Sequence, residues 1–218
     1  MITIEAVREY FRHELNNKNF TEDRNGGKTI ELIGASFLAD ECAIFGKPNQ
    51  EYIDAEIDWY VHQSTNINDI YRDDREPPAA WKMTANDHGE INSNYGHLIF
   101  GEKYYCQFDQ VVLELTKNRD SRRASMIYTR PSIWMEYNEN EKNDFICTNS
   151  VTYYIRNNKL HCVVQMRSND VIFGYRNDYA WQEYVLGELA DELGLDIGQI
   201  HWQVQNLHVY ERHFHLVK

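Results

Sequence analysis

A thiol with an arginine close to it is the first combination in this sequence that could do chemistry. Cys147 comes directly before a predicted strand, and a hairpin turning at Asn157 and Asn158 would set it opposite Ser168, one residue from Arg167. A guanidinium near a thiol favours the thiolate, which is the nucleophilic form of cysteine. Two alternatives stay open. A lone cysteine is more often a small buried hydrophobic residue, and strand alternation turns Arg167 to the other face unless a bulge intervenes.

Three further arginines could bind an anion. Arg122 and Arg123 are adjacent at the entry to a predicted strand, where neighbouring side chains face opposite ways, so a surface charge and a salt bridge are their usual roles. Arg24 lies beside Gly26 and Gly27, which allow the backbone to approach an anion closely. From the residues alone, phosphate binding and simple surface charge both remain open.

The other candidates are two carboxylates and a pair of ring-bearing residues. His208 and Tyr210 alternate on one face of a predicted strand and could hold a hydroxyl group or line a half-exposed sheet face. Glu56 lies within an apolar helical pattern, where a buried proton shuttle competes with the commoner surface carboxylate. Asp178 could simply cap the start of a helix.

The elements that position these residues follow from apolar spacing and turn residues. Asn157 and Asn158 tolerate positive φ between two alternating runs, so they predict a hairpin. Strands are predicted over 29–37, 124–129, 148–156, 159–168 and 200–210, and helices over 4–15, 51–61, 104–115 and from Asn177 or Asp178 to the stop at Gly194. This interleaving favours an α/β (α+β) domain around a mixed sheet, spanning residues 1–218 as a single domain.

The composition excludes several classes of function. With 34 acidic and 22 basic residues the net charge is −12, which argues against a protein that coats nucleic acid or an anionic membrane. A hydrophobic share of 42% is sufficient for a packed core. The four cysteines form no Cys-x-x-Cys pair and no stretch reaches membrane-spanning length, so a cytoplasmic protein with reduced thiols and no metal is expected.

Several short motifs stand in one order along nearly the whole chain. They are 23–26 (DRNG), 120–123 (DSRR), 147–149 (CTN), 165–170 (QMRSND), 174–178 (GYRND) and 208–210 (HVY). In order and spacing they resemble the signature segments of the thymidylate synthase family. Within that family, long stretches are most similar to its deoxycytidylate hydroxymethylase branch, known from T-even bacteriophages: 28–37, 89–96 and 167–181.

This resemblance implies a homodimeric enzyme that transfers a one-carbon unit from 5,10-methylenetetrahydrofolate to a pyrimidine deoxynucleoside monophosphate. Cys147 would be the nucleophile at carbon 6 of the base, and Glu56 would manage protons and ordered water. The implied phosphate ligands are Arg24, Arg167 and Ser168, with Arg122 and Arg123 supplied by the partner subunit. His208 and Tyr210 would hold the sugar hydroxyl, while Trp81, Tyr95 and Asp170 would line the base and folate cavity.

The choice of base depends on Asp178. Where synthases carry the asparagine that pairs with uracil, four residues after a glycine, this chain has Asp178 after Gly174. An ionised carboxylate only accepts hydrogen bonds, which suits the amino group of cytosine. The resemblance therefore favours a deoxycytidylate (dCMP) 5-hydroxymethyltransferase over a deoxyuridylate (dUMP) hydroxymethylase or a thymidylate synthase.

A non-enzymatic alternative also stays open, namely an inactive scaffold or RNA-binding relative. The chain ends at Lys218, eight residues after Tyr210, whereas family members continue with a segment over the folate site. If the protein ends there, closure over folate is expected to be impaired. The net charge of −12 argues against RNA.

Overall fold

The computed structural model of the chain describes residues 2–23 and 25–218, so the predicted anion ligand Arg24 lies outside the described residues. The chain divides into two compact units. The first contains Met1–Pro48 and Tyr153–Lys218, and the second contains Asn49–Thr152.

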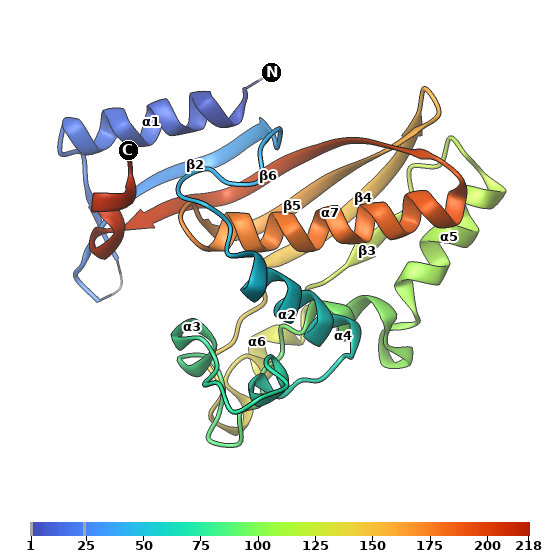
Figure 1. Ribbon diagram of the computed structural model, residues 1–218, viewed down its shortest axis with the longest axis horizontal. Helices are drawn as coiled ribbons and strands as arrows, with labels where there is room; N and C mark the ends of the chain where they lie inside the picture. Colours follow the sequence, from blue (N-terminus) through green and yellow to red (C-terminus); the bar gives the residue numbers. More distant parts are fainter. Residues whose placement is uncertain (1, 24) are drawn as a thin grey trace. The chain divides into compact units, whose positions relative to one another are not determined.

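The predicted mixed sheet is confirmed. Its strand order is β1-β2-β6-β5-β4-β3 (Figure 1). In the first unit β2 pairs with β6 in antiparallel fashion and β5 pairs with β6 in parallel, while β3 pairs with the first half of β4 in the second unit. The strands are β1 Thr21–Glu22, β2 Lys28–Leu38, β3 Ser125–Ile127, β4 Thr148–Arg156, β5 Lys159–Asp170 and β6 Asp196–Tyr210.

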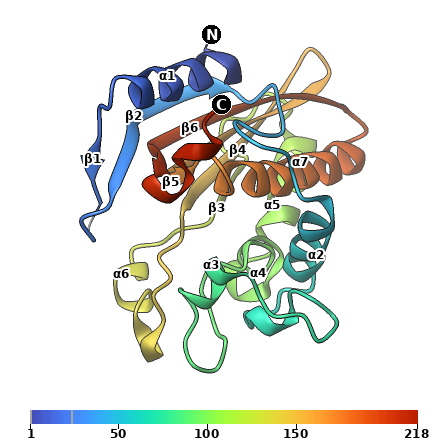
Figure 2. The same cartoon turned by 60° about the vertical axis from the view of Figure 1, so that its left-hand side comes forward.

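Two long helices belong to the first unit. Helix α1 (Ile4–Asn16) lies along β2, and α7 (Gly174–Leu193) lies along β5 and β6 (Figure 2). The second unit is mostly helical, and 3₁₀ turns join its elements. Its α-helices are α2 Gln50–Val61, α3 Ala79–Lys82, α4 Tyr95–Phe100, α5 Gln107–Lys117 and α6 Ile133–Glu136, and the 3₁₀ turns are η1 Ile67–Asp69, η2 Glu102–Tyr104 and η3 Glu139–Glu141; the first unit ends in η4, Glu211–Leu216.

Burial of the four-residue apolar repeat holds α7 against the sheet. Trp181, Val185 and Leu189 are buried, and the ring of Tyr175 meets that of Trp202 on β6 edge to face at 5.1 Å. Gly194 ends the helix with a φ of 63°, as predicted from the sequence. Among the described residues, no helix combines the length and apolar character needed to cross a membrane.

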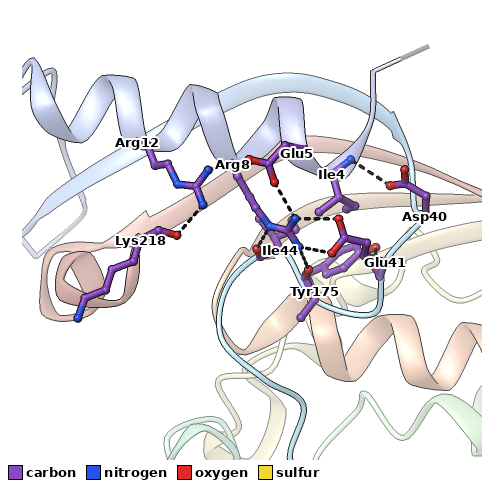
Figure 3. A network of polar contacts seen from close by, with 10 residues as sticks. Ile4, Glu5, Arg8, Arg12, Asp40, Glu41, Ile44, Tyr175 and Lys218 are labelled. Atoms are coloured by element: carbon purple, nitrogen blue, oxygen red, sulfur yellow. Dashed lines mark hydrogen bonds and ion pairs between the residues drawn. The ribbon is translucent and has the colours of Figure 1, made fainter.

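A polar network fixes the start of α7 to α1 through the segment that follows β2 (Figure 3). The guanidinium of Arg8 donates to both carboxylate oxygens of Glu41 at 2.7 Å and to the carbonyl of Ile44 at 2.5 Å. The hydroxyl of Tyr175, in the first turn of α7, donates to the carbonyl of Glu41 at 2.9 Å. The hydrogen bonds that Arg8 donates to Glu41 raise the pKa of Arg8 further, so this charge is permanent.

The predicted hairpin between β4 and β5 is confirmed, and both turn residues, Asn157 and Asn158, have positive φ. The start of α7 is a correction. The helix begins at Gly174 and not at Asn177 or Asp178, so Asp178 does not cap it. Instead, the carboxylate of Asp170, four residues before the first helical residue, accepts hydrogen bonds from the backbone amides of Ile172 and Phe173.

Candidate active site

The connection between β5 and α7 is a tight polar turn built around Asp170. One carboxylate oxygen of Asp170 accepts from the backbone amide of Ile172 at 3.0 Å, and the other accepts from the amide of Phe173 at 3.1 Å. These contacts satisfy two donors just before the helix starts. The ring of Phe173 remains 41% exposed beside this carboxylate.

Asp178 is held from β5 by Asn169. The amide nitrogen of the buried Asn169 donates to Oδ2 of Asp178 at 2.7 Å. Gly174 leaves room for this pair, because a Cβ atom at that position would lie 3.1 Å from Nδ2 of Asn169. Asp178, which sequence reasoning selected for base recognition, is therefore oriented by a neighbour whose role that reasoning missed.

His208 and Tyr210 lie together on β6, as their alternation predicted. Their ring centroids are 4.8 Å apart and nearly perpendicular. Asp170 on β5 is the register partner of His208. Burial lowers the pKa of His208, although the charge of Asp170 opposes this. A neutral imidazole beside a phenol can donate and accept hydrogen bonds without adding charge.

Arg167 and Ser168 occupy the same end of β5 and are both half-buried. Ser168 lies beside Asn206 in the β5–β6 register. The first unit thus brings Ser168, Asp170 and His208 to one end of two adjacent strands. The pairing of Cys147 with Ser168 stays a prediction.

In the second unit, Glu56 is a buried carboxyl group held by two aromatic side chains. The hydroxyl of Tyr52 and the indole nitrogen of Trp81 both donate to Oε1 of Glu56, the latter at 3.1 Å. Trp81 also donates to the Tyr52 hydroxyl at 2.9 Å. Burial raises the pKa of Glu56 to about 7, and the two hydrogen bonds oppose that rise. A carboxyl that titrates near neutrality can both give and take a proton.

Trp81 and Glu56 therefore belong to one cluster, while Tyr52 was missed. Tyr52 stands four residues before Glu56 on α2, so the i, i+4 spacing was a signal that could have identified it. Glu56 is buried, so it is not a surface carboxylate. Its role in proton transfer stays a prediction.

Two further candidates of the second unit, Cys147 and Tyr95, are shielded from solvent to different degrees. Cys147 is half-buried directly before β4, with Sγ 3.9 Å from the carbonyl of Phe145. Tyr95 is buried and stacks on Tyr60 with centroids 5.4 Å apart, so it packs in the core.

The arginine pair lies in the loop before β3, and both side chains are exposed. Arg123 forms an ion pair with Glu114 at 3.1 Å, which is the salt bridge expected of one member of the pair. Arg122 makes no hydrogen bond or ion pair with any residue that the structure describes, and its charge is available at the surface.

Comparisons with known proteins agree with the motifs. Residues 7–218 match the family model described as thymidylate synthase. The chain is 50% identical over 223 residues to the deoxycytidylate 5-hydroxymethyltransferase of Enterobacteria phage T4, covering 99% of this chain and 89% of that protein. It is 33% identical over 165 residues to the thymidylate synthase of Fusobacterium nucleatum, covering 73% and 56%. The crystal structure of thymidylate synthase from T4 phage has the same fold, with a TM-score of 0.77 at 20% identity, covering 96% and 77%.

Proposed function

Because the chain belongs to the thymidylate synthase family, we propose that it is a deoxycytidylate 5-hydroxymethyltransferase. The enzyme would transfer a one-carbon unit to carbon 5 of dCMP and then add water, which gives 5-hydroxymethyl-dCMP. The identity of 50% to a phage protein of that name supports this assignment.

The observation that carries the proposal is the carboxylate of Asp178, held by Asn169 at 2.7 Å. A carboxylate offers acceptors only, and the amino group of cytosine offers donors. The oxygen at carbon 4 of uracil would meet an acceptor and leave both polar groups unpaired, so the site would discriminate strongly against uracil.

In the proposed reaction the thiolate of Cys147 adds to carbon 6 of cytosine, and carbon 5 becomes nucleophilic. The one-carbon unit is supplied by 5,10-methylenetetrahydrofolate, a co-substrate at the oxidation level of formaldehyde. After transfer and loss of tetrahydrofolate, water adds to the exocyclic methylene group and Cys147 leaves carbon 6. Asp170 and the exposed ring of Phe173 fit a flat heteroaromatic donor, since they offer hydrogen-bond acceptors next to an apolar surface.

Glu56 would hold the proton and the water that this sequence of steps needs. Its pKa of about 7 lets it act as acid and base at neutral pH. Tyr52 and Trp81, which donate to Oε1, would fix the orientation of the carboxyl group.

The remaining charged and polar candidates would bind the sugar phosphate. We propose that Arg167, Ser168 and Arg24 bind the phosphate, joined by Arg122 and Arg123 of a second subunit, and that His208 and Tyr210 hold the sugar hydroxyl. The exposure of Arg122 and Arg123 supports their service to another subunit.

The test is to incubate the protein with dCMP and 5,10-methylenetetrahydrofolate and to identify the products by mass spectrometry. 5-Hydroxymethyl-dCMP and tetrahydrofolate are expected, and turnover of dUMP in place of dCMP would overturn the assignment. A 5-fluoropyrimidine nucleotide should form a covalent adduct that maps to Cys147. The variant Cys147→Ser should form none, whereas Cys42→Ser, which changes an exposed thiol, should behave like the wild type.

A further inference from the structure

Asn169 carries a buried oxygen for which the described residues provide no hydrogen-bond partner. The side chain is 4% exposed, and its nitrogen is engaged with Asp178 at 2.7 Å. Its oxygen, Oδ1, has no donor among the residues that the structure describes. Leaving a buried amide oxygen unpaired is unfavourable, so such an atom indicates a ligand or a bound water.

The contact with Asp178 also identifies which terminal atom of the Asn169 amide is the oxygen that points away from Asp178. An ionised carboxylate cannot donate, so the nitrogen of Asn169 must face it and Oδ1 must be the other terminus. Gly174 permits this arrangement, since a Cβ atom there would lie 3.1 Å from Nδ2 of Asn169 and 3.9 Å from Oδ2 of Asp178. One short segment thus presents a carboxylate and an amide oxygen together.

We propose that Asn169 is a second specificity-determining residue, whose Oδ1 accepts one hydrogen of the cytosine amino group while Asp178 accepts the other. The proposal rests on the proposed function and deepens it. The amino group has two N–H bonds, and a carboxylate alone satisfies only one in a given geometry. In uracil, the oxygen at carbon 4 is itself an acceptor and would lie against two further acceptors. Asn169 and Asp178 together would therefore reject uracil more strongly than Asp178 alone.

The first test uses the unmodified protein and N4-methyl-dCMP, in which a methyl group replaces one of the two hydrogens. If both hydrogens are bound, kcat/KM for this analogue should fall about 10-fold or more below that for dCMP. The variant Asn169→Ala opens space and removes the acceptor, so it should discriminate against the methyl group much less. Equal use of dCMP and N4-methyl-dCMP by the wild type would overturn the proposal.

The second test measures the ratio of kcat/KM for dCMP to that for dUMP in Asn169→Ala. The ratio should fall about 10-fold or more, whereas a general loss of folded protein would lower both kcat/KM values alike and leave the ratio unchanged. Asn206→Ala controls for the loss of an asparagine that holds a carboxylate, because Asn206 donates to Glu31 at 2.9 Å. It should leave the ratio unchanged.

Two outcomes separate the role of Asn169 from the proposed function. If the wild type turns over dCMP and Asn169→Ala keeps the full selectivity, only the role of Asn169 is rejected. If the wild type turns over neither nucleotide, the proposed function is rejected and the role of Asn169 falls with it.

Discussion

At the scale of single residues, the environment of Asp178 determines the proposed choice of base. The variant Asp178→Asn replaces an acceptor-only group by one that can also donate, while keeping its shape. We expect the ratio of kcat/KM for dUMP to that for dCMP to rise by about 10-fold or more, because the new donor can pair with the uracil oxygen. Steady-state kinetics with both nucleotides measure it. An unchanged ratio would remove Asp178 from base recognition.

Glu56 is the residue for which burial and chemistry are most directly linked. Its pKa is about 7 in the folded protein and the ordinary value is 4.5, so the folded state binds the proton more tightly than the unfolded state. The stability that this group contributes is therefore fully present below about pH 4.5 and is lost as the pH rises through about 7.

The variant Glu56→Gln should remove this pH dependence, because an amide does not ionise. Relative to wild type, the variant should gain on the order of 3 kcal/mol of unfolding free energy between pH 4 and pH 8. It should also lose most of its activity if Glu56 handles protons. Chemical denaturation at the two pH values measures the first effect, and Glu51→Gln, at an exposed position on the same helix, is the control. Parallel pH profiles for wild type and Glu56→Gln would contradict the expectation.

Sequence reasoning reached these residues to different degrees. Glu56 was identified, but its burial was not, because Trp81, one of the two groups that hold it, is 25 residues away along the chain. Asn169 lay inside a recognised motif but was passed over, because its role exists only through its contact with Asp178 in the fold.

At the scale of elements, patterning predicted the long strands and helices, but it missed the short elements β1, α3, α4 and α6 and misplaced several boundaries, among them the starts of α5, α7 and β6. The alternation and the asparagine pair predicted the β4–β5 hairpin, since both signals are local. The start of α7 was placed too late because Asn and Asp are common helix caps. In the structure, Asp170 lies before the helix and accepts hydrogen bonds from the two backbone amides that precede it. The residue pattern within the helix does not predict this contact.

Helices α2 and α4 of the second unit approach each other closely at Gly96, which predicts that a larger residue there would destabilise the protein. A Cβ atom on Gly96 would lie 1.7 Å from the carbonyl oxygen of Tyr60, which is backbone and cannot move aside. Gly96→Ala should therefore destabilise the protein by about 3 kcal/mol or more, or prevent folding. The matched control is Gly187→Ala on α7, whose new methyl would have its nearest neighbour at 4.0 Å.

Gly187→Ala should instead stabilise the protein by about 0.5–1 kcal/mol, because alanine is the better helix former. Thermal unfolding of both variants beside the wild type measures the difference in sign. If Gly96→Ala and Gly187→Ala changed the melting temperature in the same direction and by a similar amount, the close approach of Gly96 to Tyr60 would not explain the need for glycine there.

At the scale of the whole molecule, the net charge is −12, so a surface of uncharged side chains is a candidate for contact with another protein. Ser36, Gln203 and Gln165 lie side by side on β2, β6 and β5. Both glutamines are exposed, and they hydrogen-bond to each other at 2.9 Å. Buried residues such as Met166 and Val204 alternate with them. Because interface cores are depleted in charge, this face of the sheet suits a second copy of the chain.

If the proposed homodimer uses this face, adding charge to it should separate the subunits. Gln203→Glu places one carboxylate on each subunit in the same contact, where desolvation and mutual repulsion both oppose association. Sedimentation velocity should show a dimer for the wild type and a monomer, or a dimer about 10-fold weaker or more, for the variant.

The same monomer should lose activity if the partner supplies Arg122 and Arg123, and mixing should restore it in part. Gln203→Glu with intact arginines, mixed with an Arg122→Ala, Arg123→Ala double variant, can form a heterodimer in which one site is complete and one copy of the new charge is absent. Gln50→Glu, which adds the same charge at an exposed position on α2, controls for net charge. A Gln203→Glu protein that remains a fully active dimer would place the subunit contact elsewhere.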